Sequence, residues 1–245
     1  MKAAPRISPA PTLLPVTPRE RLIVALDVPE LDEARVLVER LSPAVHWFKV
    51  GSELFTSAGP RAVALVLEHG GRVFLDLKFH DIPHTVSGAV SAAVRLGVSM
   101  INVHASGGEA MMRAAVGARG DAAAHVIGVT ALTSAVEDAS RVLEMAQGAR
   151  EAGLDGVVAS PQDVALIKQA CGPSFIVVTP GIRPAPVRSD DQRRTATPEG
   201  AVRAGSDFLV VGRPVLGASD PLDAARRILD EMIRAETTGA PGSEQ

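Results

Sequence analysis

Eight short apolar runs recur along this chain of 245 residues, and a segment with helical spacing follows them in turn. The first run, at 22–28, reads Leu-Ile-Val-Ala-Leu-Asp-Val, and residues 30–41 then place apolar side chains three and four positions apart. Continuous apolar runs of this length are typical of strands buried on both faces of a parallel sheet. The other runs lie at 46–51, 74–79, 100–105, 125–130, 156–160, 175–180 and 208–212.

The order of these segments predicts the fold class. Strands that alternate with helices indicate a parallel sheet, and eight repeats favour an α/β fold of the single (β/α)8 TIM-barrel type. An open, doubly wound sheet is the main alternative, although no Gly-x-Gly-x-x-Gly follows the first run. We expect the barrel to span 19–236, with a disordered or loosely ordered Pro-rich arm at 1–18 and a disordered tail at 237–245.

Several helix boundaries can be predicted from local signals. Helical spacing or breaker residues place helices at 60–69, 86–96, within 136–152, and at 221–235. Ser160-Pro161 has the pattern of a helix cap with proline at the first helical position. Thr197-Pro198 predicts the start of another short helix.

Composition excludes several classes of protein. A formal net charge of -3 argues against nonspecific nucleic-acid binding by the whole surface. The single cysteine, Cys171, excludes an internal disulfide framework and fits a reducing cytoplasm, and no Cys/His spacing resembles a zinc site. No apolar run approaches the roughly 20 residues that span a bilayer. We therefore expect a cytoplasmic protein with neither a membrane nor a nucleic acid as partner.

Charged side chains interrupt the third apolar run at Asp76 and Lys78. Residues two apart in a strand share a face, so this acid and this amine point toward the same enclosed space. A structural ion pair at a strand end is one interpretation. A functional site is favoured because other polar residues end or follow the neighbouring runs, where barrel enzymes carry their working groups. These residues are Asp27, Lys49, Asp81, His104, Thr133, Arg183 and Arg213.

Two arginines indicate an anion-binding end of this site. Gly212-Arg213 follows the eighth run, where (β/α)8 barrels commonly bind a phosphate. Arg183 arrives from the neighbouring run and opens a polar segment, 183–197, that is longer than an ordinary connection and is typical of a functional lid. A phosphorylated metabolite fits both the arginines and the acid/amine cluster.

The motifs at these strand ends resemble those of the orotidine 5'-phosphate decarboxylase family, type 1. The resemblance extends from about residue 21 to 235, with its motifs in order. They are Ala25-Leu26-Asp27, Lys49-Val50-Gly51, Asp76-Leu77-Lys78-Phe79-His80-Asp81-Ile82-Pro83, Val103-His104-Ala105, Leu132-Thr133-Ser134, Thr179-Pro180-Gly181-Ile182-Arg183, Asp191-Gln192 and Val211-Gly212-Arg213-Pro214. The resemblance implies a (β/α)8 barrel that converts orotidine 5'-monophosphate to UMP and CO2, the last step of UMP synthesis, without a cofactor or a metal.

The resemblance also implies a role for each matching residue. Lys78 corresponds to the proton donor and Asp76 to the carboxylate that faces the substrate's own, and Lys49 and Asp81 complete a charged tetrad. In this family Asp81, Ile82 and Thr85 are supplied by the partner subunit of a homodimer. The remaining implied contacts are Asp27 and Lys49 to the ribose, Thr133 and Gln192 to the base or the closing loop, and Arg183, Gly212 and Arg213 to the phosphate.

Two alternatives and one departure qualify this interpretation. A Mg²⁺-dependent sugar-phosphate decarboxylase or aldolase of the same superfamily shares Asp-x-Lys-x-x-Asp, but the Thr179-to-Arg183 stretch and Gln192 favour the nucleotide enzyme. A catalytically silent barrel that binds a phosphorylated ligand could lose Lys78 without penalty, yet the whole tetrad is present. The departure is His84, where the family often has Asn.

Overall fold

The computed structural model describes residues 17–130, 138–184 and 195–238. Its strands form one closed barrel in the order β1 to β8, and β8 pairs in parallel with β1. The fold class expected from the alternation of strands and helices, a (β/α)8 barrel, is confirmed. The strands are β1 (Leu22–Ala25), β2 (Trp47–Gly51), β3 (Arg72–Phe79), β4 (Met100–His104), β5 (His125–Val129), β6 (Gly156–Val158), β7 (Ile176–Thr179) and β8 (Phe208–Val211).

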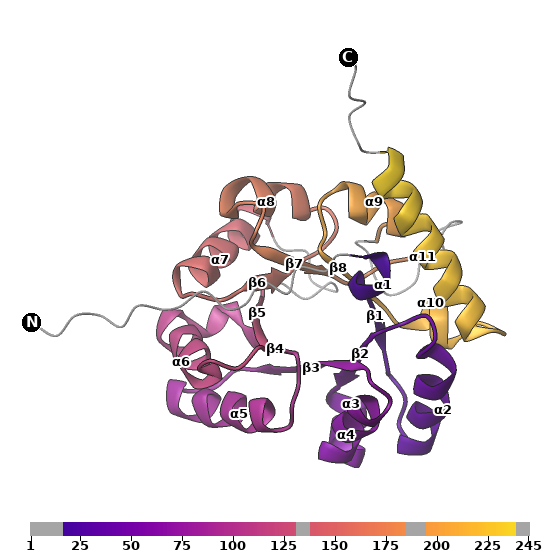
Figure 1. The fold of residues 1–245 in the computed structure, drawn as a ribbon. Coiled ribbons are helices and arrows are strands. Elements are labelled where there is room, and N and C mark those ends of the chain that lie inside the picture. The colour runs from indigo at the N-terminus through magenta and orange to yellow at the C-terminus, as the bar shows by residue number, and fades with distance from the viewer. Residues whose placement is uncertain (1–16, 131–137, 185–194, 239–245) are drawn as a thin grey trace, which may run out of the picture.

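Helices surround the strands, and the last helix, α11, packs beside α2 and α1, the first helices that the structure describes (Figure 1). Among the residues that the structure describes, no helix is both long and apolar enough to cross a membrane. The helices are α1 (Pro18–Arg21), α2 (Leu31–Leu41), α3 (Ser52–Ala58), α4 (Pro60–Glu68), α5 (Pro83–Arg95), η1 (Ala105–Gly107), α6 (Glu109–Arg119), α7 (Ala139–Glu151), α8 (Val164–Cys171), α9 (Pro198–Arg203), α10 (Arg213–Leu216) and α11 (Pro221–Thr238).

Some local expectations were wrong in detail. The expected cap at Ser160 does not form, because the Ser160 hydroxyl donates to the Asp163 side chain at 2.6 Å and α8 begins only at Val164. The short helices α3 and α10 were not expected, and α11 continues to Thr238 rather than ending near Ala235. The helix at Thr197-Pro198 is confirmed, with Thr197 Oγ1 accepting from the Gly200 amide.

The core has two layers, as expected for strands that are buried on both faces. Successive side chains of β1 belong to different layers: Leu22 and Val24 pack outward against helices, whereas Ile23 points into the barrel. Inside the barrel, Trp47 and Phe208 meet edge to face with ring centroids 5.3 Å apart. These rings begin β2 and β8, so they fill the end of the barrel that is opposite the carboxyl ends of the strands.

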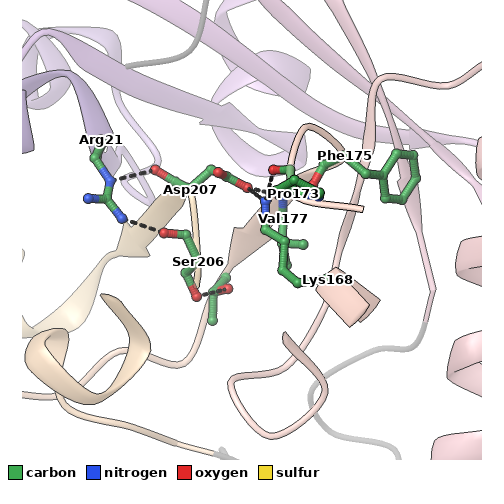
Figure 2. A network of polar contacts seen from close by, with 8 residues as sticks. Arg21, Lys168, Pro173, Phe175, Val177, Ser206 and Asp207 are labelled. Carbon is green, nitrogen blue, oxygen red and sulfur yellow. Dashed lines mark hydrogen bonds and ion pairs between the residues drawn. The ribbon is translucent and has the colours of Figure 1, made fainter. Parts of the chain in front are cut away.

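Two half-buried carboxylates tie helices to strands at this closed end. Asp207, just before β8, accepts from Lys168 Nζ of α8 at 2.6 Å and from the Val177 amide of β7 at 2.7 Å. Figure 2 shows this network, in which Arg21 also donates to the backbone oxygens of Ser206 and Asp207. Asp155 repeats the arrangement before β6, where it accepts from Arg119 of α6 and from the Val126 amide. Each carboxylate therefore joins one helix and two adjacent strands.

We expect Asp207→Ala to lower the free energy of unfolding by about 3 kcal/mol, because it leaves the largely buried Lys168 ammonium with carbonyl acceptors but no counter-charge, and the Val177 amide without its acceptor. Denaturant unfolding followed by circular dichroism measures this loss. The control is Asp223→Ala, which removes an exposed ion pair to Arg227 within α11 and should cost less than about 0.5 kcal/mol. Equal losses in the two variants would contradict a structural role for the Asp207 network.

Candidate active site

A chain of ion pairs crosses the barrel mouth from β1 to β3. Lys49 Nζ lies 2.8 Å from Asp27 Oδ1 and 3.3 Å from Asp76 Oδ2. Lys78 Nζ lies 2.6 Å from Asp76 Oδ1. Asp27 follows the end of β1, while Lys49 belongs to β2 and the other two residues to β3. The expected convergence of acid and amine groups from neighbouring strands is therefore observed in these four residues.

These ion pairs fix the ionisation states of Lys49 and Asp76, the two buried residues among the four. Burial would lower the pKa of Lys49, but the carboxylates of Asp76 and Asp27 outweigh it and the pKa is raised. Burial would raise the pKa of Asp76, but the ammonium groups of Lys49 and Lys78 and two side-chain hydrogen bonds hold it below its usual range. Lys49 is thus a cation and Asp76 an anion at neutral pH.

Gly51 permits the close packing of this cluster. A Cβ atom at this position would lie 3.0 Å from Lys49 Nζ and 3.3 Å from Asp27 Oδ1. Since such distances are tighter than ordinary contacts of a methyl group, a side chain would push the lysine or the aspartate aside. The glycine of Lys49-Val50-Gly51 therefore has a packing role next to the ion pair.

The ion pairs and the two arginines line the same cavity, which has a volume of about 250 Å³. The arginines follow β7 and β8, and β8 pairs directly with β1, so they adjoin the ion pairs at the Asp27 end; Arg183 is 8% exposed. One part of the cavity wall thus carries alternating charges, and the adjoining part carries guanidinium groups suited to an anion. Its lining is Ala25, Asp27, Lys49, Phe74, Asp76, Lys78, Asn102, Val129, Val158, Pro180, Arg183, Val210, Gly212 and Arg213.

Asn102 is a polar residue of the site to which sequence reasoning gave no role. Its Nδ2 donates to Asp76 Oδ1 at 2.6 Å, and the residue is 1% exposed. The available signal was an amide side chain in the middle of the otherwise apolar run Met100-Ile101-Asn102-Val103. Such a residue needs buried partners.

Other expected site residues either do not line the cavity or lie outside the residues that the structure describes. Asp81, Ile82 and Thr85 are exposed and do not line the cavity of their own chain; Asp81 Oδ1 accepts from the Ile82 amide at 2.6 Å. His84 is also exposed, near the start of α5. Thr133 and Gln192 lie outside the described residues.

Two histidines stand beside the charged cluster. The rings of His80 and His104 have centroids 5.2 Å apart. Burial, followed by the neighbouring His80 and Lys78, lowers the pKa of His104. With its pKa lowered, His104 is neutral at neutral pH and serves as a local packing partner, and we assign it no proton transfer.

The fold and this cavity define a (β/α)8-barrel enzyme whose working groups lie at the carboxyl ends of its strands. Comparison with known proteins identifies the family. The model of the orotidine 5'-phosphate decarboxylase / HUMPS family matches residues 20–228. The chain belongs to this family, as its motifs indicated.

Relatives match almost along their whole length. The orotidine 5'-phosphate decarboxylase of Moorella thermoacetica is 54% identical over 233 residues, which cover 87% of this chain and 92% of the relative. That of Geobacter sulfurreducens is 49% identical, with coverages of 88% and 97%. The crystal structure of orotidine 5'-phosphate decarboxylase from Lactobacillus acidophilus superposes with a TM-score of 0.76 at 36% identity and covers 87% of this chain and 99% of its own.

Proposed function

We propose that this chain decarboxylates orotidine 5'-monophosphate to UMP and CO2, with Lys78 as the proton donor and without a cofactor. One observation carries the proposal: the Asp76–Lys78 pair and the two arginines line one cavity. Family membership and the names of the relatives support the choice of substrate. The reaction is the last step of UMP synthesis.

The proposed chemistry needs a cation at the reacting carbon. When the bond between C6 and the carboxylate carbon breaks, CO2 leaves and the electron pair stays on C6. The Lys78 ammonium stabilises this developing charge more strongly in an enclosed site than in water, and its proton then moves to C6. Solvent reprotonates the amine. Asp76 lies 2.6 Å from the ammonium and faces the departing carboxylate, which favours its loss as neutral CO2.

The rest of the substrate has matching partners in the cavity. Arg183, Gly212 and Arg213 bind the phosphate, and Asp27 with Lys49 binds the ribose hydroxyls. Binding energy from the distant phosphate then holds C6 against Lys78. In the same proposal Thr133 and Gln192 contact the base or the loop over it.

A homodimer completes the proposed site. Residues 80–85 form one exposed stretch at the carboxyl end of β3, and Ile82 is 65% exposed. The exposure of the whole stretch leaves these side chains available for an interface between two copies of the chain. Asp81, Ile82 and Thr85 would enter the partner's cavity, where Asp81 adds the fourth charge of the tetrad.

The direct test follows the ultraviolet absorbance of orotidine 5'-monophosphate in the presence of the purified chain. We expect turnover that 5 mM EDTA changes by less than about twofold, because the proposed step uses an ammonium rather than a metal ion. Stable absorbance would reject the proposed activity. Turnover that EDTA abolishes and Mg²⁺ restores would instead favour the chemistry of metal-dependent sugar-phosphate enzymes.

A further inference from the structure

The backbone at Lys78 has an unusual conformation. Lys78 is the non-glycine residue with a positive φ, 51°, in the described part of the chain. A side chain in this left-handed region costs about 1–3 kcal/mol unless the surroundings compensate. Such strain at the residue that faces the reacting atoms calls for a physical cause.

The register between β3 and β4 supplies part of the cause. Leu75 pairs with Ile101, but the next pair along the strands is Phe79 with Val103. Four steps along β3 therefore match two steps along β4, so β3 carries two extra residues between these pairs. The bulge lies at Asp76, Leu77 and Lys78, and it redirects the chain next to the charged groups.

Asn102 of β4 spans this bulge with both ends of its amide. Its Oδ1 accepts from the Lys78 backbone amide at 2.8 Å, and its Nδ2 donates to Asp76 Oδ1 at 2.6 Å. The orientation of the amide is determined by chemistry, since a backbone N–H can only donate and an ionised carboxylate can only accept. Asn102 is 1% exposed, so neither bond competes with bulk water.

We propose that Asn102 is a positioning residue for the decarboxylation, which holds the Lys78 backbone in its left-handed conformation and fixes the Asp76 carboxylate against the Lys78 ammonium. The proposal rests on the proposed role of Lys78 as the proton donor. Asn102, on the neighbouring strand β4, acts through these two residues. One hydrogen bond holds the backbone amide of Lys78, and the other holds the carboxylate of Asp76.

Two variants separate this role from simple packing. Asn102→Ala removes both hydrogen bonds, whereas Asn102→Asp has the same size, keeps an acceptor for the Lys78 amide and loses the donor to Asp76. We expect each variant to lower kcat by about 100-fold, the effect of misplacing a reacting group by about 1 Å. The dissociation constant of the product UMP should change by less than about threefold, because the phosphate and ribose contacts stay intact. Ser206→Ala, which removes the buried bond to the Thr179 hydroxyl, is the matched control and should keep kcat within about twofold.

A crystal structure of Asn102→Ala distinguishes failure of this inference from failure of the proposed function. We expect Lys78 to leave the positive φ region or its Nζ to move from Asp76. Retention of both features would overturn the positioning role, whatever Lys78 does in the reaction. A kcat within about threefold of the native value in both variants would also overturn it, as would a loss that Ser206→Ala reproduces. Turnover by Lys78→Ala, in contrast, would reject Lys78 as the proton donor. The backbone φ of Lys78 and its contact with Asp76 in the Asn102→Ala crystal would then decide alone whether Asn102 positions these residues.

Discussion

Replacement of Lys78 by alanine is expected to lower the turnover of orotidine 5'-monophosphate by more than about 1,000-fold, since it removes both the charge that stabilises the C6 electron pair and the proton that quenches it. UMP should still bind within a few-fold of its native affinity, because Arg183, Arg213, Asp27 and Lys49 remain in the cavity. Steady-state absorbance assays measure the first quantity, and isothermal titration with UMP measures the second.

Lys78→Arg is the matched variant for this experiment. Arginine keeps a cation beside Asp76, but a guanidinium is a much weaker acid than an ammonium and does not release a proton at a useful rate. We expect this variant to lose turnover as well, and it should unfold at a denaturant concentration close to the native one. Native turnover in either variant would contradict the proposed proton transfer. A loss of UMP binding in parallel with turnover would assign Lys78 to binding instead.

The second large effect concerns two inactive variants that restore each other. Lys78→Ala lacks the proton donor, and Asp81→Ala lacks the residue that we expect the partner subunit to supply. In a heterodimer of the two, one site combines Lys78 of one chain with Asp81 of the other and is intact. Random exchange at equal concentrations makes about half of the dimers mixed, so about one quarter of all sites should be native. Activity measured after exchange should rise to that fraction.

The control for this mixing experiment pairs Lys78→Ala with Asp76→Ala. Both residues belong to the ion pair within one chain, so every site in this mixture lacks one of them and no activity should return. Mass spectrometry of differently tagged chains verifies that exchange has occurred. If the Asp81→Ala mixture stays inactive after verified exchange, each site uses its own Asp81 or none. Activity of Asp81→Ala alone would remove this residue from the proposed tetrad.

Much of the fold followed from local signals in the chain. The run at 22–28 and its successors have the apolar continuity of doubly buried strands, and the structure places Ile23 inside the barrel and Val24 outside. Helices marked by helical spacing and a closing glycine, such as the one after the third strand, were also predictable. Ser160-Pro161 was misleading, because the serine hydroxyl bonds to Asp163, a preference that the local pattern does not encode.

The candidate site was predictable as a set of residues. Asp27, Lys49, Asp76, Lys78, Arg183 and Arg213 follow or end predicted strands, and the carboxyl ends of parallel strands converge on one mouth. The assignment of Asp81, Ile82 and Thr85 to a partner subunit stays a prediction, as do the contacts of Thr133 and Gln192.

The sequence by itself determined the barrel and the charges at its mouth, because the spacing of apolar residues and the alternation of strands with helices are local properties of the chain. Only the tertiary structure decided how Asp76 and Lys78 are held. Their bulge depends on the register between β3 and β4, which is set by packing between segments that are distant in the chain. The same register brings the Asn102 amide to the strained Lys78 backbone, a contact that spans 24 positions of sequence.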